Sequence, residues 1–330
     1  QFLFLELLFY KKTTIYPLCL SERKFNLSIR PAISTSLASP TLEGAGVHLH
    51  RAFGFNQPEL FDPFLLLDDF RNDDPDAFAG GFPWHPHRGI ETITYVLNGS
   101  VDHSDSLGNS GKLNSGDIQW MTAGAGIMHQ EMPTGNVKGQ MHGFQLWANL
   151  PGSLKMTSPR YQDVEGTEIP EITDDDGTIV KVITGEFWGQ RGPVDGIAAD
   201  PLYLDITIPT GCQKSFKVDT YRNTFAYIFE GAGKFVDASS PKGILLEKEV
   251  LGKELNIRDM SGNRTLVQFG TGEEIVVRAG PKGLRFLLVA GTPIQEPVAW
   301  HGPIVMNTKE ELQQAFSDLR NNRFIKPNDH

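Results

Sequence analysis

Gly81-Phe-Pro-Trp-His-Pro-His-Arg-Gly-Ile-Glu-Thr92 and Ile127-Met-His-Gln-Glu131 each place two metal-binding side chains two residues apart. Side chains at that spacing on an extended strand point to the same face of the strand. Each segment can therefore direct both of its side chains at one point. Three imidazoles and one carboxylate form a mixed nitrogen and oxygen donor set that suits a divalent transition metal. The predicted ligands are His85, His87, His129 and Glu131.

The distribution of histidines places this predicted site in the N-terminal half. Residues 143–300 contain no histidine, whereas five of the nine histidines lie between His85 and His142. A single His-x-His pair is weak evidence, because most histidines lie on surfaces or satisfy hydrogen bonds in the core. The second pair, in a strand-like segment after a glycine-rich turn, favours a shared metal site.

The other histidines of the N-terminal half have different interpretations. His103 lies in a polar strand end and turn, and we interpret it as a surface residue. His142 opens a strand, and we predict that it lies beside a ligand or in the pocket. His48 and His50 form another His-x-His pair, but no second ligand pair accompanies them. We interpret these two as one face of an early strand.

The composition indicates a globular chain. Its 330 residues suffice for a bilobed fold or two domains, and a hydrophobic fraction of 39% suffices for a packed core. The net charge of −10 argues against a nucleic-acid-binding surface, which needs clustered Lys and Arg, but leaves binding to a transcription factor open. The two cysteines form no Cys-x-x-Cys pair, so neither a zinc ribbon nor a disulfide framework is expected. A reducing compartment fits best, and we expect a cytoplasmic protein, or a nuclear one in a eukaryote.

Residues 1–40 differ from the rest of the chain. The first ten are apolar but fall short of the roughly twenty residues needed to span a bilayer, and no basic segment precedes them. Lys11 to Pro40 contains five basic residues, one acidic residue and several Ser and Thr. This pattern fits either an organellar targeting peptide or sequence that is foreign to the mature protein. We predict that residues 1–40 lie outside the fold.

The remainder consists of short β-branched and aromatic segments separated by Gly, Asn, Asp and Pro, which predicts strands and tight turns. Many short strands without alternating helices indicate an all-β sandwich or barrel. Two such runs predict two stacked barrels at residues 41–150 and 176–330, joined by a linker at 151–175. One C-terminal helix is expected after Thr308, where Glu311 completes a capping box. Its apolar face consists of Leu312, Phe316 and Leu319.

The motif spacing resembles that of the cupin superfamily. His85-x-His87-x-x-x-Glu91 matches the first cupin motif, His-x-His-x(3,4)-Glu. Gly116 to His129 resembles the second motif, with Thr122 in place of the usual proline. Longer blocks are similar to the pirin family, and the resemblance covers roughly residues 42–320. These blocks are Gly81–Thr92, Gly116–Pro133, Gln145–Trp147 and His301–Thr308.

The resemblance implies a bicupin with jelly-roll-like barrels, one iron ion in the N-terminal barrel and no metal in the C-terminal barrel. The family's ligands correspond to the four residues named above. In ordinary cupins the first-motif glutamate, here Glu91, binds the metal, whereas in pirins the glutamate after the third histidine does so. Glu131 also shares a strand face with His129. Glu91 then becomes a candidate for orienting a ligand or binding an arginine.

The resemblance also implies an activity. Three imidazoles and one carboxylate leave positions on Fe(II) for O2 and a chelating substrate. Family members are associated with quercetin 2,3-dioxygenase activity, in which a flavonol heterocycle is cleaved with loss of carbon monoxide. Glu131 would act as the base. Residues near the ligands in sequence would line an aromatic-binding mouth or pack in the core: Phe82, Trp84, Trp120 and Met121.

A second interpretation uses the same site without turnover. Pirin-like proteins also act as iron-dependent redox sensors that bind a transcription factor. A metal-free structural cupin is a third interpretation, which the four intact ligands disfavour. Donor type alone does not separate iron from zinc, manganese, nickel or copper. We expect a monomer that binds neither nucleic acid nor a membrane.

Overall fold

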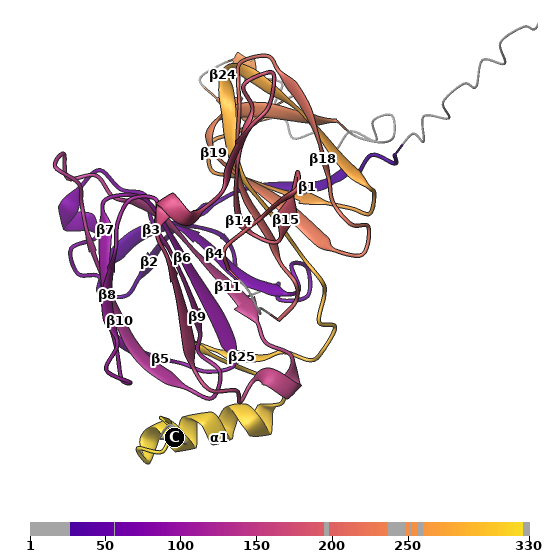
Figure 1. The fold of residues 1–330 in the computed structure, drawn as a ribbon. Helices are drawn as coiled ribbons and strands as arrows, with labels where there is room; N and C mark the ends of the chain where they lie inside the picture. The colour runs from indigo at the N-terminus through magenta and orange to yellow at the C-terminus, as the bar shows by residue number, and fades with distance from the viewer. Residues whose placement is uncertain are drawn as a thin grey trace, which may run out of the picture.

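The structure, a computed structural model, describes residues 27–55, 57–194, 198–236, 248–250, 253–255 and 260–325. It is built almost entirely of antiparallel strands arranged in two barrel-like halves, with one helix near the C-terminus (Figure 1). The predicted all-β bicupin with a short C-terminal helix is therefore confirmed. None of the described helices combines the length and hydrophobicity that crossing a bilayer requires.

Two facing sheets form the N-terminal half. The seven-stranded sheet contains, in spatial order, β12 (Arg160–Val164), β9 (Ile118–Thr122), β6 (Ile90–Asn98), β11 (His142–Asn149), β4 (Phe64–Asp69), β3 (Val47–Phe53) and β2 (Ser39–Glu43). The four-stranded sheet contains β5 (Phe82–His87), β10 (Ile127–Thr134), β7 (Ser100–Asp105) and β8 (Ser110–Leu113). The central strands are rich in β-branched and aromatic residues, which favour a buried pleated sheet.

One nine-stranded sheet dominates the C-terminal half. Its main path is β1 (Ala32–Leu37), β23 (Thr265–Phe269), β19 (Asn223–Val236), β24 (Glu274–Gly291), β17 (Leu202–Ile208), β14 (Ile179–Thr184) and β13 (Glu171–Thr173). In addition, β18 (Gln213–Lys217) pairs with β24, and β22 (Ser261–Gly262) pairs with β19.

The remaining elements are short. Two-stranded sheets are formed by β15 (Glu186–Phe187) with β16 (Gln190–Arg191), β20 (Lys248–Val250) with β21 (Lys253–Leu255), and β25 (Ala299–His301) with β26 (Ile304–Met306). Single 3-10 turns are η1 (Pro75–Ala77), η2 (Gly152–Leu154) and η3 (Gly166–Glu168). The helix is α1 (Lys309–Arg320), and its N-terminus carries the predicted capping box between Thr308 and Glu311.

The structure departs from the predicted domain boundaries at both proposed connections. Residues 1–26 lie outside the described residues, but β1, inside the segment that we expected outside the fold, pairs with β23 of the C-terminal sheet. The predicted linker 151–175 likewise supplies β12 to the N-terminal sheet and β13 to the C-terminal sheet. An edge strand such as β1 buries little side-chain surface, so no hydrophobic alternation marks it in the sequence.

The C-terminal segment returns to the N-terminal barrel, where α1 lies below β5 and β10 (Figure 1). The backbone N–H of Val305 donates to the carbonyl of Arg88 over 3.0 Å. The buried Arg88 guanidinium donates to Asp318 Oδ2 over 2.9 Å and to the carbonyl of Phe324 over 3.0 Å. The N-terminal end of the described chain thus packs on the C-terminal sheet, and the C-terminal end packs on the N-terminal barrel.

A polar network joins the two halves around the interface. Tyr95 donates to Asp205 over 2.8 Å, and Tyr227 donates to Asp69 over 3.0 Å. His142 lies beside Asp69, but at 3.7 Å its Nε2 is too far for a hydrogen bond. Burial lowers the pKa of His142 to about 3, and nearby arginines, Arg71 first among them, act in the same direction.

Replacing Asp318 tests the role of the C-terminal anchor. Asp318→Ala leaves the buried Arg88 charge without its carboxylate, and we expect the free energy of unfolding to fall by about 3–5 kcal/mol. Urea denaturation of the metal-free protein measures this change. Gln313→Ala, at an exposed position of the same helix, serves as the control. Equal stability of the Asp318→Ala variant and the wild type would show that the helix is not an essential anchor.

His142 makes the folded state sensitive to acid. Its folded pKa lies below the ordinary value of 6.5, so the unfolded chain takes up a proton that the folded chain does not. Its contribution to stability is therefore present above about pH 6.5 and is lost as the pH falls towards 3. We expect His142→Gln to make the loss of stability in this window shallower by up to about 1.4 kcal/mol per pH unit. Urea denaturation at several pH values measures the free energy of unfolding of both proteins. If that free energy changes with pH equally in the wild type and in His142→Gln, the assignment is contradicted.

Candidate metal centre

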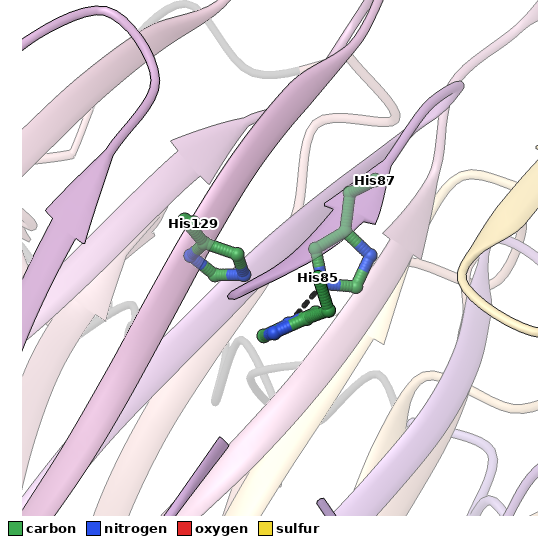
Figure 2. Close-up of side chains that lie close together, drawn as sticks. All are labelled: His85, His87 and His129. Carbon is green, nitrogen blue, oxygen red and sulfur yellow. Dashed lines mark hydrogen bonds between the residues drawn. The ribbon is translucent and has the colours of Figure 1, made fainter. Parts of the chain in front are cut away.

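Pairing of β5 with β10 brings three histidines together. In this register His129 lies opposite His85, and His87 is two residues further along the same face of β5. Figure 2 shows the three rings pointing toward one another from these two strands. One nitrogen from each ring can be chosen so that all three lie within 4.8 Å of one another. The group lies inside the N-terminal barrel, and two of its members, His87 and His129, are buried.

Backbone carbonyls orient two of these rings. Nδ1 of His85 donates to the carbonyl of Pro83 over 2.9 Å, and Nδ1 of His87 donates to the carbonyl of Pro303 over 3.2 Å. Each Nε2 then carries a lone pair, and the two Nε2 atoms are 3.1 Å apart. Both ring nitrogens of His129 are buried without a hydrogen-bond partner in the described part of the chain. Converging lone pairs and unpaired buried nitrogens fit a bound cation.

The electrostatics of the three rings favour the form that binds metal. Burial lowers the pKa of His85. Burial, reinforced by the neighbouring imidazoles, holds the pKa values of His87 and His129 well below their ordinary range. All three rings are therefore neutral at physiological pH, and a neutral imidazole is the species that coordinates a metal ion.

Glu131 lies next to the histidine group but is not part of it. Its side chain projects from the same face of β10 as His129 and lines a cavity together with His85 and His87, although its oxygens lie outside the 4.8 Å group. Burial raises the pKa of Glu131 to about 7, and a hydrogen bond of 2.9 Å from the Thr94 hydroxyl opposes that rise. Thr94 also lies 2.7 Å from Gln145 Oε1. A single hydroxyl proton cannot serve both, so either the Gln145 amide donates to Thr94 or Glu131 holds a proton.

His85 and His87 open onto a cavity of about 270 Å³ between the two N-terminal sheets. Its walls combine apolar side chains with a small number of polar groups, an arrangement common to small-molecule sites. The apolar part includes Leu49, Leu66, Phe70, Phe82 and Trp147, and the polar part includes Arg51, Asp68, Thr94, Glu131 and Gln145.

Of the four residues that we expected at an aromatic-binding mouth or in the core, one lines the cavity. Phe82 lines the cavity, whereas Trp84 is 50% exposed and does not. Trp120 and Met121 are buried in two hydrophobic clusters away from the cavity wall. For these two residues the alternative of core packing holds. Proximity in sequence to a ligand does not place a side chain on the cavity wall, because the sheet carries successive residues to opposite faces.

Two further predictions need correction. His103 is not on the surface: it is 5% exposed, lies opposite Glu131 in the β7–β10 pairing, and its Nε2 is 3.0 Å from Gln119 Nε2. Buried and exposed side chains alternate along β7, and His103 is on the buried face. His142 does not line the cavity but lies at the interface between the halves.

Glu91 is buried on β6 and accepts a hydrogen bond of 2.7 Å from the Thr122 hydroxyl. Burial raises the pKa of Glu91, the hydrogen bond from Thr122 opposes that rise, and the positive charge of Arg160 also opposes it. Glu91 is neither on the cavity wall nor in the histidine group. The geometry thus gives Glu131, not Glu91, the position beside the histidines.

Several cavity residues had no signal in our sequence analysis. Thr94 is an ordinary strand residue there, and the Arg51–Asp68 ion pair joins two strands whose pairing was not predicted. Gln145 belongs to the block Gln145–Trp147, which marks a resemblance but no role in the cavity. The block His301–Thr308 was noted for its resemblance alone, yet it supplies the Pro303 carbonyl that orients His87.

Comparison with known proteins shows the same organisation. The family model described as Pirin matches residues 46–148, and the one described as the pirin C-terminal cupin domain matches residues 203–325. A pirin-like protein of Caulobacter vibrioides is 43% identical over 303 residues, covering 90% of this chain and 100% of the relative. A quercetin 2,3-dioxygenase from Acinetobacter baumannii superposes with a TM-score of 0.78 at 29% identity, covering 90% of this chain and 99% of that chain.

A more distant structure, a bacterial pirin from Escherichia coli in complex with nickel(II), shares the fold. It has a TM-score of 0.55 at 18% identity and covers 79% of this chain and 100% of that chain.

Metal analysis of purified variants tests the histidine group. We expect the wild type to bind one divalent transition-metal ion per chain, and the His129→Ala variant to retain little of it, because the three imidazoles supply most of the affinity. His142→Gln serves as the control, because His142 is a half-buried histidine of the same barrel that lies outside the group. With free metal at 100 times the Kd, thermal unfolding should show about 2.7 kcal/mol of added stability in the wild type and none in His129→Ala. Undiminished metal content in His129→Ala would mean that the ion binds elsewhere.

Proposed function

This chain belongs to the pirin family, and on that premise we propose that it binds one Fe(II) ion in the N-terminal barrel and cleaves flavonol-like substrates with O2. The observation that carries the proposal is the group of three neutral histidines, two of which, His85 and His87, lie at the wall of a largely apolar cavity. The structural relative from Acinetobacter baumannii, a quercetin 2,3-dioxygenase, supports the reaction class.

The residues that would hold the ion are His85, His87 and His129, with Glu131 as the adjacent carboxylate. When bound, Fe(II) supplies a redox-active cation that can bring O2 and an electron-rich enolate together. The donor set alone also accepts other divalent ions, and the nickel(II) in the Escherichia coli relative is a property of that protein. We propose iron as the native metal because O2 chemistry requires a redox-active ion. Elemental analysis of protein purified without chelator tests this assignment.

Glu131 would remove the proton from the flavonol hydroxyl. In the metal-free protein burial raises the pKa of Glu131 to about 7, which makes this carboxylate a stronger base than an exposed glutamate. Thr94 holds Oε1 of Glu131 and leaves Oε2 for the substrate. The overall reaction consumes one O2, opens the heterocycle and releases one carbon monoxide, so both oxygen atoms end in the organic product.

The cavity walls would orient the substrate and exclude water. At about 270 Å³ the cavity is slightly below the usual range of roughly 300–1,000 Å³ for drug-sized ligands, which favours a flat molecule over a bulky one. The ring of Trp147 lies 5.0 Å from that of His87, so an aromatic surface borders the histidine group. The redox-sensing interpretation uses the same histidines but predicts no turnover. An assay of oxygen uptake therefore distinguishes the dioxygenase from the sensor.

Oxygen uptake with quercetin, together with detection of carbon monoxide, tests the proposal. The iron-loaded wild type should consume oxygen and flavonol together. Glu131→Gln should retain iron on the three histidines while kcat falls by about 10²–10⁴-fold, the usual contribution of a general base. Glu91→Gln is the matched control, since Glu91 is a buried glutamate in the same barrel but does not line the cavity.

Iron-loaded Glu131→Gln with full turnover would remove Glu131 from the mechanism. An iron-loaded wild type that consumes no oxygen with quercetin would refute the proposed activity. Affinity for a protein partner that changes with the oxidation state of the iron, without turnover, would then favour the sensor.

A further inference from the structure

A row of polar side chains crosses the floor of the cavity on four adjacent strands. Thr94 on β6 lies opposite Gln145 on β11, Gln145 lies opposite Asp68 on β4, and Asp68 lies opposite Arg51 on β3. All four side chains line the cavity. We call these four residues the polar row. Neighbouring strands are about 4.8 Å apart, so the row is roughly 14 Å long.

The two ends of the polar row differ in chemistry. At one end Thr94 bonds to Glu131, the carboxylate beside the histidines. At the other end the Arg51 guanidinium donates to both oxygens of Asp68, over 2.8 and 2.7 Å, and its Nη2 also lies 2.8 Å from Glu43 Oε1. The row therefore leads from the predicted reaction centre to a bidentate ion pair.

A series of aromatic rings connects the same two ends. The ring of Trp147 lies 5.0 Å from His87 and 6.1 Å from Trp300. Trp300 is 4.5 Å from Phe55, and the Arg51 guanidinium lies 5.2 Å from the centre of the Phe55 ring. Trp147 and Phe55 themselves line the cavity. An elongated ligand placed along the polar row would thus have aromatic surface beside it.

The charges at the Arg51 end favour a neutral hydroxyl over an acid. One guanidinium faces two carboxylates, Asp68 and Glu43, so the local charge is net negative and would repel an anionic ligand. A phenolic hydroxyl can donate to either carboxylate. It can also accept from an N–H of the Arg51 guanidinium, whose bonds to Asp68 and Glu43 use Nε and Nη2. Asp68 and Arg51 are mostly buried, with side chains 7% and 16% exposed, so such bonds would be shielded from water.

We propose that Arg51, Asp68 and Glu43 form a hydroxyl-binding subsite, and that the substrate is a polyphenol of two or more rings. Its enolic end lies at the histidines, and a hydroxylated ring lies between Arg51 and Asp68. The reacting end of this assignment rests on the proposed function; the subsite itself rests on the polar row and the aromatic series. A single-ring phenol held at the histidines would be too short to reach Arg51.

Two flavonols that differ only in the pendant ring test the subsite. Quercetin carries hydroxyls on that ring and galangin carries none. Binding to the iron-loaded protein is measured under anaerobic conditions by calorimetry and by quenching of tryptophan fluorescence. We expect the wild type to bind quercetin about tenfold more tightly than galangin, corresponding to about 1.4 kcal/mol for hydrogen bonds to charged groups.

Asp68→Asn and Arg51→Gln should reduce this preference to within about twofold while changing the affinity for galangin little, since only the hydroxyl contacts are lost. Arg71→Gln is the matched control. Arg71 is also paired with a carboxylate of β4, namely Asp69, but it donates to the carbonyl of Phe229 in the C-terminal half and does not line the cavity. It should keep the wild-type preference. Thermal unfolding of each variant confirms that it is folded.

The outcomes separate the subsite from the activity. If the wild type binds the two flavonols equally tightly, the subsite is refuted without reference to any variant. A preference for quercetin that survives in both Asp68→Asn and Arg51→Gln also refutes it. So does a preference that is lost in Arg71→Gln as well. Quercetin turnover without the preference leaves the proposed function standing and the subsite refuted. A preference that depends on Arg51 and Asp68, in a protein that consumes no oxygen, supports the subsite and refutes the activity. Failure of both flavonols to bind the wild type refutes both.

Discussion

The pairing of β5 with β10 in one register is the constraint on which the site depends. It sets His129 opposite His85 and leaves His87 on the same inward face. Because side chains alternate along a strand, a slip of one residue would turn part of the donor set away from the barrel interior. The same rule aligns the polar row across β6, β11, β4 and β3. Register therefore determines both the candidate metal centre and the cavity floor beside it.

Burial, together with the packing of the C-terminal segment on the N-terminal barrel, then determines the protonation and orientation of these side chains. Removal from water keeps the three imidazoles neutral and raises the pKa of Glu131 to about 7. That enclosure involves the whole chain, because the Pro303 carbonyl from the C-terminal segment orients His87 and Arg88 anchors α1. Because the C-terminal segment packs on the N-terminal barrel, the site depends on residues more than two hundred positions away in sequence.

Local patterns in the sequence were enough to predict the β class, the capped helix and the three histidines, because each depends on spacing within a few residues. What failed depends on long-range pairing. Nothing in the exposed Ala32–Leu37 segment signals that β1 joins the far sheet. His103 was assigned to the surface from polar neighbours, although strand alternation turns it inward. The Arg51–Asp68 pair was invisible because it is formed only when β3 meets β4.

X-ray absorption spectroscopy at the iron edge of the iron-loaded protein tests the central claim most directly. We predict scattering from three imidazole rings together with oxygen donors, and the imidazole signal should weaken in the His87→Ala variant. A spectrum dominated by oxygen, without imidazole scattering, would show that iron binds away from these histidines and would contradict the account.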